Sequence, residues 1–201
     1  MLYRSLIIVL LAVASLYAQS ELSKSRFIVQ ADLNYTKLYV SQAEHSYYSK
    51  YKQTFNGNGD FWLQFGREFR FVKGRLSLTP SIGLNRNGWS FERAGHSGSI
   101  SYIVPYVSVA FGLHPGMFFI DVGMHYGRAT FCFGEVDGKS STDDDSYFSE
   151  GSTGYFAHVG IDFLDHFRAG LAWRGYGMGF ENQFSSVGEV YGLGGFFAYM
   201  F

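Results

Sequence analysis

The sequence predicts an all-β protein, an eight-stranded antiparallel up-and-down transmembrane β-barrel. Three observations lead to this prediction. Apolar residues recur at every second position over most of the chain, which is the period of a β-strand. Aromatic residues make up 19% of the chain, with 21 Phe and 15 Tyr beside 25 Gly. After the first 18 residues, no apolar run approaches the roughly 18 residues of a membrane-spanning helix.

Residues 1–18 are expected to be a secretory signal peptide. Arg4 supplies a positive start, residues 6–13 form an apolar core, and cleavage is expected after Ala18, with Ala14 as a second candidate. The remaining residues 19–201 are expected to form one barrel domain.

The mature chain is close to neutral. The full chain has 16 basic and 17 acidic residues, so removal of Arg4 leaves 15 basic and 17 acidic residues, a net charge of −2. This balance argues against a nucleic-acid partner. Cys132 is the only cysteine, so no internal disulfide forms, and the residue is interpreted as a small apolar strand residue.

Eight segments show the alternating pattern of a strand. They are Arg26–Tyr39, Asp60–Phe71, Leu76–Asn85, Ile103–Leu113, Phe118–Gly127, Tyr155–Phe163, Phe167–Arg174 and Val187–Phe201. In the first segment, Phe27 and Val29 alternate with Ile28 and Gln30. In the third, Pro80 lacks the N–H that a ladder needs, which predicts a local bulge.

The connections between these segments alternate between long and short. Long polar stretches are Ser41–Asn58, Glu92–Gly98, Gly134–Gly151 and Gly177–Ser186, and short turns are Val72–Gly74, His114–Gly116 and Leu164–His166. An even strand number with short turns at one end and long loops at the other is typical of barrels in the bacterial outer membrane. Both termini then lie at the short-turn, periplasmic end, and four long loops are extracellular.

The two faces of the segments differ, and the difference predicts which one faces lipid. One face is apolar, whereas the other is small or charged, and a charge facing lipid near the membrane midplane costs about 2–4 kcal/mol. The polar face is therefore placed in the lumen, as a network of Asp32, Glu68, Arg70, Asp121, His125, His158, Asp162, Arg168 and Arg174. A soluble lipocalin-like binding barrel, the alternative, requires the reverse arrangement.

Aromatic residues cluster beside the short turns, as expected for a girdle at the periplasmic interface. They are Phe27, Phe71, Phe118, Phe163, Phe167, Tyr199 and Phe201. The last segment ends on Phe201, with Tyr199 and Phe197 on the same face. This ending resembles the C-terminal signature of bacterial outer-membrane β-barrels, in which the last strand closes the barrel against the first.

The whole mature chain resembles the small eight-stranded outer-membrane proteins of the OmpA transmembrane-domain and OmpX type. The resemblance implies residence in the outer membrane of a Gram-negative-type bacterium. It also implies three kinds of partner: outer-membrane lipids with lipopolysaccharide, the barrel-assembly machinery, and a surface ligand of the extracellular loops.

Two lumen pairs have residue types that could bind metal or transfer protons. Asp121 and His125 are four residues apart on one segment, and His158 and Asp162 on another. A structural network is favoured, because charges inside a narrow lumen need partners such as Arg168. No catalytic residue, cofactor or metal is therefore assigned.

Two outer stretches could bind ligands. Residues 143–145 are three consecutive aspartates that could attract a divalent cation, but a solvated loop is the favoured interpretation. Tyr47, Tyr48 and Tyr51 are either a contact patch or a continuation of the strands above the membrane.

The sequence favours a structural or surface-interaction role, in adhesion or envelope integrity, and no enzymatic activity. The alternative is an outer-membrane lipid A or phospholipid-modifying enzyme, since barrels of this size include a lipid A deacylase and a palmitoyltransferase. The deacylase pattern has a Ser two residues after a His, whereas His158 and His125 are followed at that position by glycine. An open pore is disfavoured because side chains fill an eight-stranded lumen.

Overall fold

The computed structural model describes residues 24–39, 54–57, 59–93, 96–128, 130–136, 139–141, 152–179 and 187–201. The expected signal peptide, the tyrosines of residues 47–51 and the aspartates of residues 143–145 lie outside these residues. Among the described residues, no helix is long and apolar enough to cross a membrane.

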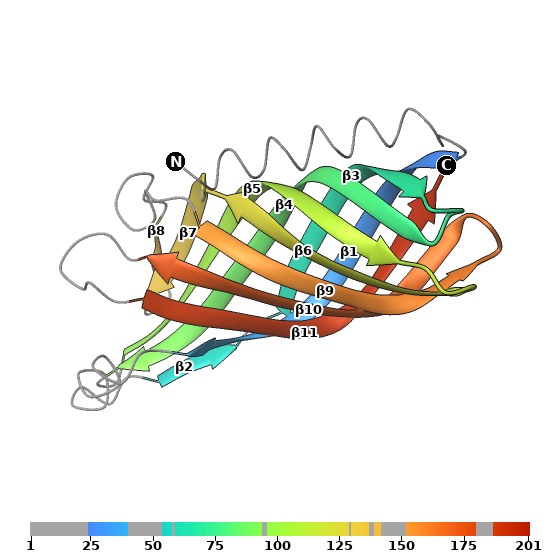
Figure 1. Ribbon diagram of the computed structural model, residues 1–201. Helices are drawn as coiled ribbons and strands as arrows, with labels where there is room; N and C mark the ends of the chain where they lie inside the picture. Colours follow the sequence, from blue (N-terminus) through green and yellow to red (C-terminus); the bar gives the residue numbers. More distant parts are fainter. Residues whose placement is uncertain are drawn as a thin grey trace.

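Eight strands close into an antiparallel barrel (Figure 1). They are β1 (Lys24–Tyr39), β3 (Gly59–Phe71), β4 (Leu76–Arg93), β5 (His96–Leu113), β6 (Phe118–Gly127), β9 (Ser152–Phe163), β10 (Phe167–Gly179) and β11 (Val187–Met200). Each pairs with its neighbours along the chain, and β1 pairs with β11 to complete the ring. The predicted fold class is confirmed.

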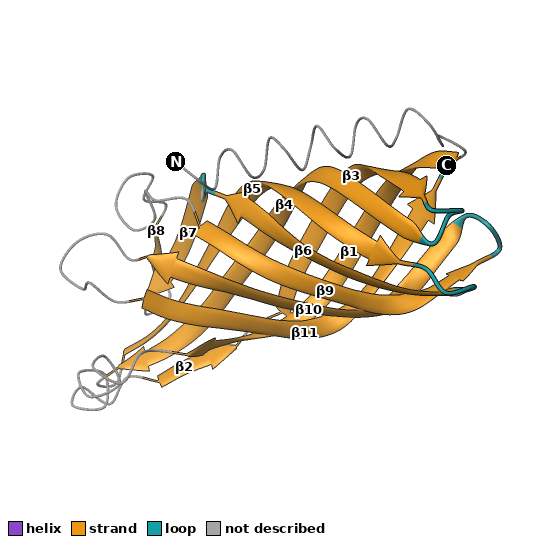
Figure 2. Cartoon of the chain, viewed as in Figure 1, coloured by secondary structure: helices purple, strands orange, loops and turns teal. Residues whose placement is uncertain are grey.

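The three short turns gather at one end of the barrel, called here the turn end (Figure 2). After β3, Val72 and Lys73 have φ angles of 50° and 54°, and after β9, Leu164 and Asp165 have φ angles of 50° and 58°. Consecutive positive φ angles are those of the primed hairpin turns, whose twist matches that of paired strands. The opposite end, called the loop end, carries the connections that are longer in sequence, apart from that between β4 and β5.

The prediction of a second long loop at Glu92–Gly98 is wrong. β4 and β5 stay paired up to Arg93 and His96, so only residues 94 and 95 separate the two strands. The register between them is unbroken from Leu76 opposite Leu113 to this tip. The hydrogen-bonded ladder therefore continues well past the predicted strand ends, because the two strands are already aligned in register below them.

Three short strands extend the barrel wall at the loop end: β2 (Thr54–Gly57), β7 (Phe131–Val136) and β8 (Lys139–Ser141). β2 pairs with β4, β7 pairs with β5, and β8 pairs with β7. With the ends of β4 and β5 they form a five-stranded sheet, called here the loop-end sheet, and Figure 1 shows β2 and the paired ends of β4 and β5 extending past the other strands.

A β-bulge marks each place where the loop-end sheet joins the barrel. Tyr106 pairs with Gly127, whereas Ile103 pairs with Phe131, so one extra residue lies on the side of β6 and β7. In the same way, Phe61 pairs with Arg86, whereas Gly57 pairs with Trp89. An extra residue on one strand increases the local bend and twist.

The bulge expected at Pro80 is absent. On the β3 side the pairing runs from Phe61 opposite Arg86 to Gly66 opposite Ser81 and resumes at Phe69 opposite Leu78 in the same register. The missing N–H of Pro80 therefore interrupts the ladder without adding a residue.

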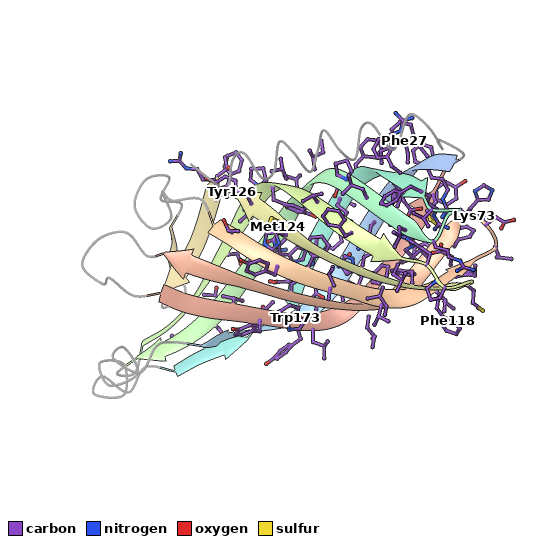
Figure 3. The ribbon with its side chains drawn as sticks, in the orientation of Figure 1. Phe27, Lys73, Phe118, Met124, Tyr126 and Trp173 are labelled. Atoms are coloured by element: carbon purple, nitrogen blue, oxygen red, sulfur yellow. The ribbon has the colours of Figure 1, made fainter. Side chains whose placement is uncertain are left out.

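The two faces of the barrel wall have opposite chemistry. Leu33, Leu84, Val122, Leu171 and Leu193 are exposed on the exterior, and Figure 3 shows Phe27, Phe118, Tyr126 and Trp173 at the outside of the wall. Inward side chains are buried and mostly polar, so the predicted facing is confirmed. An apolar exterior around a polar interior is the arrangement of a membrane-spanning barrel.

Aromatic rings form a belt on the exterior near the turn end. The rings of Phe27 and Phe201 stack with centroids 5.7 Å apart, and Tyr199 lies 6.0 Å from Phe201 and 5.3 Å from Phe167. The Phe163 ring stacks on Phe167 at 5.7 Å. Aromatic belts of this kind lie at the membrane–water interface.

Candidate functional site

The inward side chains form two groups of charges, and Arg168 is the centre of the first. Its Nε donates to Asp162 Oδ1 at 2.7 Å, its Nη2 to Glu68 Oε2 at 2.9 Å and its Nη1 to Asp121 Oδ2 at 3.3 Å. Asp162 lies directly opposite Arg168 in the β9–β10 register, whereas Glu68 reaches it from β3. One guanidinium thus joins carboxylates from three other strands.

Two further arginines complete this group near the turn end. Arg70 donates from Nε to Glu68 Oε1 at 2.5 Å and from Nη2 to Asp162 Oδ2 at 2.7 Å. Arg26 Nη2 lies 3.1 Å from Glu68 Oε1. We call Arg26, Glu68, Arg70, Asp121, Asp162 and Arg168 the turn-end cluster. Three arginines face three carboxylates, so these charges balance.

His114 lies beside the turn-end cluster, in the turn that follows β5. Its Nε2 is 2.8 Å from Ser77 Oγ, 3.7 Å from Glu68 Oε2 and 3.9 Å from Asp121 Oδ1. Burial away from solvent lowers the pKa of His114 to about 4, against a raising effect of the nearby Glu68 carboxylate. The imidazole is therefore neutral at physiological pH.

The second group lies further along the lumen, around Asp32. Arg174 donates from Nε to Asp32 Oδ2 at 3.0 Å, and its Nη2 donates to the same oxygen. Gln30 Nε2 donates to Asp32 Oδ1 at 2.8 Å, and His158 Nε2 lies 3.4 Å from Asp32 Oδ2. We call Gln30, Asp32, His158 and Arg174 the mid-lumen cluster.

Aromatic side chains connect and cover these clusters. The Phe119 ring stacks on His114 at 6.0 Å and meets Phe196 at 5.9 Å, and Phe196 in turn lies 4.8 Å from His158. Phe119 also lies under the Arg168 guanidinium, 4.2 Å from its Cζ. Such cation–π contacts help to offset the loss of water around a buried guanidinium.

Arg174 is held between two aromatic rings in the same way. Its Cζ lies 4.1 Å from the Trp62 centroid and 5.1 Å from that of Phe156. Trp62 also meets Tyr106 edge-on at 4.9 Å. The mid-lumen cluster is thus flanked by a layer of aromatic rings.

The expected lumen residues fall into these groups. Glu68, Arg70, Asp121, Asp162 and Arg168 lie together in the turn-end cluster, and Asp32, His158 and Arg174 in the mid-lumen cluster. His125 lies beside the mid-lumen cluster, where its ring packs against Trp62 at 5.0 Å and Phe156 at 6.3 Å, the two rings that hold Arg174. That the clusters serve only to hold and fill the barrel stays a prediction.

The two pairs singled out for chemistry do not form. Asp121 is bound to Arg168 rather than to His125, and His158 contacts Asp32 rather than Asp162. Residues four apart on a strand are about 13 Å apart along it, so they share a face without touching.

Sequence reasoning missed Arg26 and His114 as members of the polar network, and it placed Gln30 on the inward face of its strand without assigning it to the network. Arg26 and Gln30 each lie two positions from Ile28, so they share its inward face. His114 lies two positions after Gly112 and continues the face of that residue in the same way. Arg26 and His114 would have been found if each inward face had been extended by two residues, to the inward position before Ile28 and to the one after Gly112.

Side chains of both clusters are packed inside the lumen. Arg168 is 2% exposed, Arg174 is 1% exposed and Phe119 is fully buried. Among the residues that the structure describes, no group of three or more His, Cys, Asp or Glu side chains is arranged to hold a metal ion. The carboxylates of both clusters are instead bound by arginine.

No family model matches the chain, and no curated protein matches it by sequence. Solved structures do match. Ail, the attachment invasion locus protein of Yersinia pestis, aligns with a TM-score of 0.51 and 13% identity over 89% of this chain and 99% of Ail. The outer membrane protein OprG from Pseudomonas aeruginosa aligns with a TM-score of 0.50 and 10% identity over 88% of this chain and 96% of OprG. In fold, this chain is therefore an eight-stranded antiparallel β-barrel, similar to these small outer-membrane proteins.

Proposed function

We propose that this protein is an integral outer-membrane barrel with a structural or surface-interaction role, in adhesion or envelope integrity. The barrel serves as an anchor, and the loop end presents the long connections outside the cell. The filling of the lumen supports this role over that of a diffusion pore, because arginine–carboxylate clusters occupy it at two levels. Residues 1–18 are proposed to be removed as a signal peptide, leaving residues 19–201 as the barrel domain.

The observation that carries the proposal is the loop-end sheet. β2, β4, β5, β7 and β8 continue as one antiparallel sheet beyond the ring. Its outermost strand, β8, pairs with β7 on one side and with no described strand on the other. An edge of this kind leaves backbone N–H and C=O groups available to an extended segment of a partner, which is a recurrent mode of peptide recognition.

The proposed partners follow from this arrangement. The exterior contacts outer-membrane lipids and lipopolysaccharide, and a ligand outside the cell binds the loop-end sheet and its connections. The name of Ail, an attachment protein of the same fold, is in keeping with such a role. Phe197, Tyr199 and Phe201 are proposed as the signal that the barrel-assembly machinery reads.

Retention of cells on coated surfaces tests the proposal. Cells with and without the protein are passed over immobilised matrix proteins and sulfated or neutral glycans. We expect the protein to raise retention on at least one coating, and a shortened chain in which the β7–β8 hairpin is replaced by a two-residue turn to lose the gain. Equal retention on every coating would contradict a surface-interaction role.

Lipid analysis distinguishes the enzymatic alternative. Mass spectra of lipid A and phospholipids from the same two cell populations are expected to be identical. A mass change equal to one acyl chain in cells that carry the protein would replace the surface-interaction proposal with a lipid-modifying enzyme.

A further inference from the structure

Arg67 is a charged side chain on the lipid-facing exterior of β3, close to the turn end. It is exposed, and it lies opposite Phe27 in the β1–β3 register, within the aromatic belt. An arginine facing lipid at the membrane midplane costs about 2–4 kcal/mol, and the cost falls towards zero near the interface. Its position is therefore tolerable only if the guanidinium reaches the headgroup layer.

The protein holds this guanidinium in one place. Its Cζ lies 5.2 Å from the centroids of both Phe27 and Phe69, and its Nη2 donates to Ser25 Oγ at 2.9 Å. The Phe27 ring is itself fixed between Phe65 and Phe201, each 5.7 Å away. Two ring contacts and one hydrogen bond orient a side chain that would otherwise sample many rotamers.

No carboxylate within the described part of the chain is ion-paired with Arg67. The carboxylates whose side chains are described on the barrel strands are Asp32, Asp60, Glu68, Asp121 and Asp162, none of which is exposed on the exterior. A guanidinium has five N–H donors, and the contact with Ser25 uses one Nη2 group. The contact with Ser25 therefore leaves donors of Arg67 for a further partner.

We propose that Arg67, with Ser25, Phe27 and Phe69, forms a binding site for the phosphodiester of an anionic phospholipid in the membrane leaflet at the turn end. The planar guanidinium matches the geometry of two phosphate oxygens, which lysine does not. The aromatic rings would contact the glycerol and upper acyl region of the same lipid. The site is separate from the loop-end sheet, so it does not depend on the proposed surface role.

Native mass spectrometry of the purified barrel tests this site. The protein, released from a neutral detergent, is titrated with phosphatidylglycerol and, separately, with phosphatidylcholine of the same acyl chains. We expect the wild type to retain one phosphatidylglycerol preferentially, and Arg67→Gln to bind it about tenfold more weakly, as for loss of one charge-assisted hydrogen bond.

Lys73→Gln is the matched control, because it removes one positive charge from the exposed turn that follows the same strand. It is expected to bind phosphatidylglycerol as the wild type does. An equal loss in Lys73→Gln would show a diffuse charge effect and overturn the site, as would unchanged binding by Arg67→Gln.

Arg67→Lys keeps the test decisive if Arg67→Gln does not fold. This variant retains the charge but lacks the planar fork, so it is expected to bind phosphatidylglycerol several-fold more weakly than the wild type. Binding equal to that of the wild type would overturn the role of the oriented guanidinium. Folding of every variant is checked by the shift of the unheated band on a gel.

Discussion

Arg174 on β10 and Asp32 on β1 form an ion pair across β11, the strand that separates them in the sheet. Both side chains are buried, and no direct backbone pairing links their strands. The contact therefore crosses the inner face of β11, next to the seam where the last strand meets the first. It joins β10 to β1 on the inner side of the barrel wall.

Removal of one partner from this pair is expected to be costly. Asp32→Asn leaves the Arg174 guanidinium buried without its counter-charge, and we expect a loss of about 3–5 kcal/mol in the free energy of unfolding. Urea unfolding of the protein in phospholipid vesicles measures this loss. The double variant Asp32→Leu with Arg174→Met is expected to recover most of it, and a loss below about 1 kcal/mol for Asp32→Asn would show that the pair does little.

Gly170 and Gly160 lie opposite each other in the register of β10 and β9, and their closeness leaves no space for a side chain. A Cβ added at Gly170 would lie 2.7 Å from the Cα of Gly160 and closer still to the carbonyl oxygen of Val159. We expect Gly170→Ala to destabilise the barrel by about 1–3 kcal/mol in the same unfolding experiment. Gly195→Ala is the control, because its nearest contact would be an ordinary 3.6 Å, and an equal loss there would contradict the explanation.

A charge introduced on the lipid-facing surface is expected to destabilise the barrel. Leu171 is 61% exposed on β10, well away from the turn end. Leu171→Arg is expected to cost about 2–4 kcal/mol in vesicles, because the new charge faces hydrocarbon. Leu171→Met should be neutral. The same variants are also unfolded from detergent micelles. An equal loss of unfolding free energy there would indicate a packing defect rather than an effect of the lipid bilayer.

Phe201 is expected to matter for assembly. Its N–H donates to the carbonyl oxygen of Phe27 at 2.9 Å, and the Phe27 N–H donates back to the Phe201 oxygen at 2.8 Å. Phe201→Ser removes the stacked ring at this last closing pair, and we expect a several-fold drop in folded protein in the outer membrane. Phe201→Tyr should assemble normally, and a normal yield of Phe201→Ser would count against the proposed signal.

His114 predicts how stability changes with pH. Its side chain titrates near 6.5 when unfolded, whereas burial lowers its pKa to about 4 in the folded barrel. Between these values the unfolded chain binds more protons, so stability should fall by up to about 3 kcal/mol as the pH decreases from 6.5 to 4. Unfolding midpoints of the wild type and His114→Gln across this range give the measurement. Parallel curves would exclude His114 as the cause.

The strands and their facing could be predicted from the sequence because both are local. Phe118–Gly127 agrees with β6 at both ends, since apolar and polar residues alternate strictly and His114–Gly116 lies just before it. Contacts across the lumen could not be predicted, because they depend on barrel closure and strand register. Arg168 reaches Glu68 from 100 residues away, which no spacing in the sequence indicates.

The errors have the same origin. The loop predicted at Glu92–Gly98 was inferred from polarity, but the structure pairs these residues because β4 and β5 are already aligned below them. Pro80 suggested an extra residue, whereas the neighbouring pairs hold the register on both sides of it. Polar residues and proline indicate where a strand could end or bulge. Pairing with the neighbouring strands then determines whether the strand continues.

The bulges next to Gly57 and Phe131 have a consequence for variation of this protein. Each absorbs one extra residue where the loop-end sheet joins the ring, so insertions above that level need not shift any pairing below it. The barrel and the sheet can therefore diverge at different rates. Hairpins of other lengths could therefore replace the loop-end sheet while the strand pairing of the barrel stays the same.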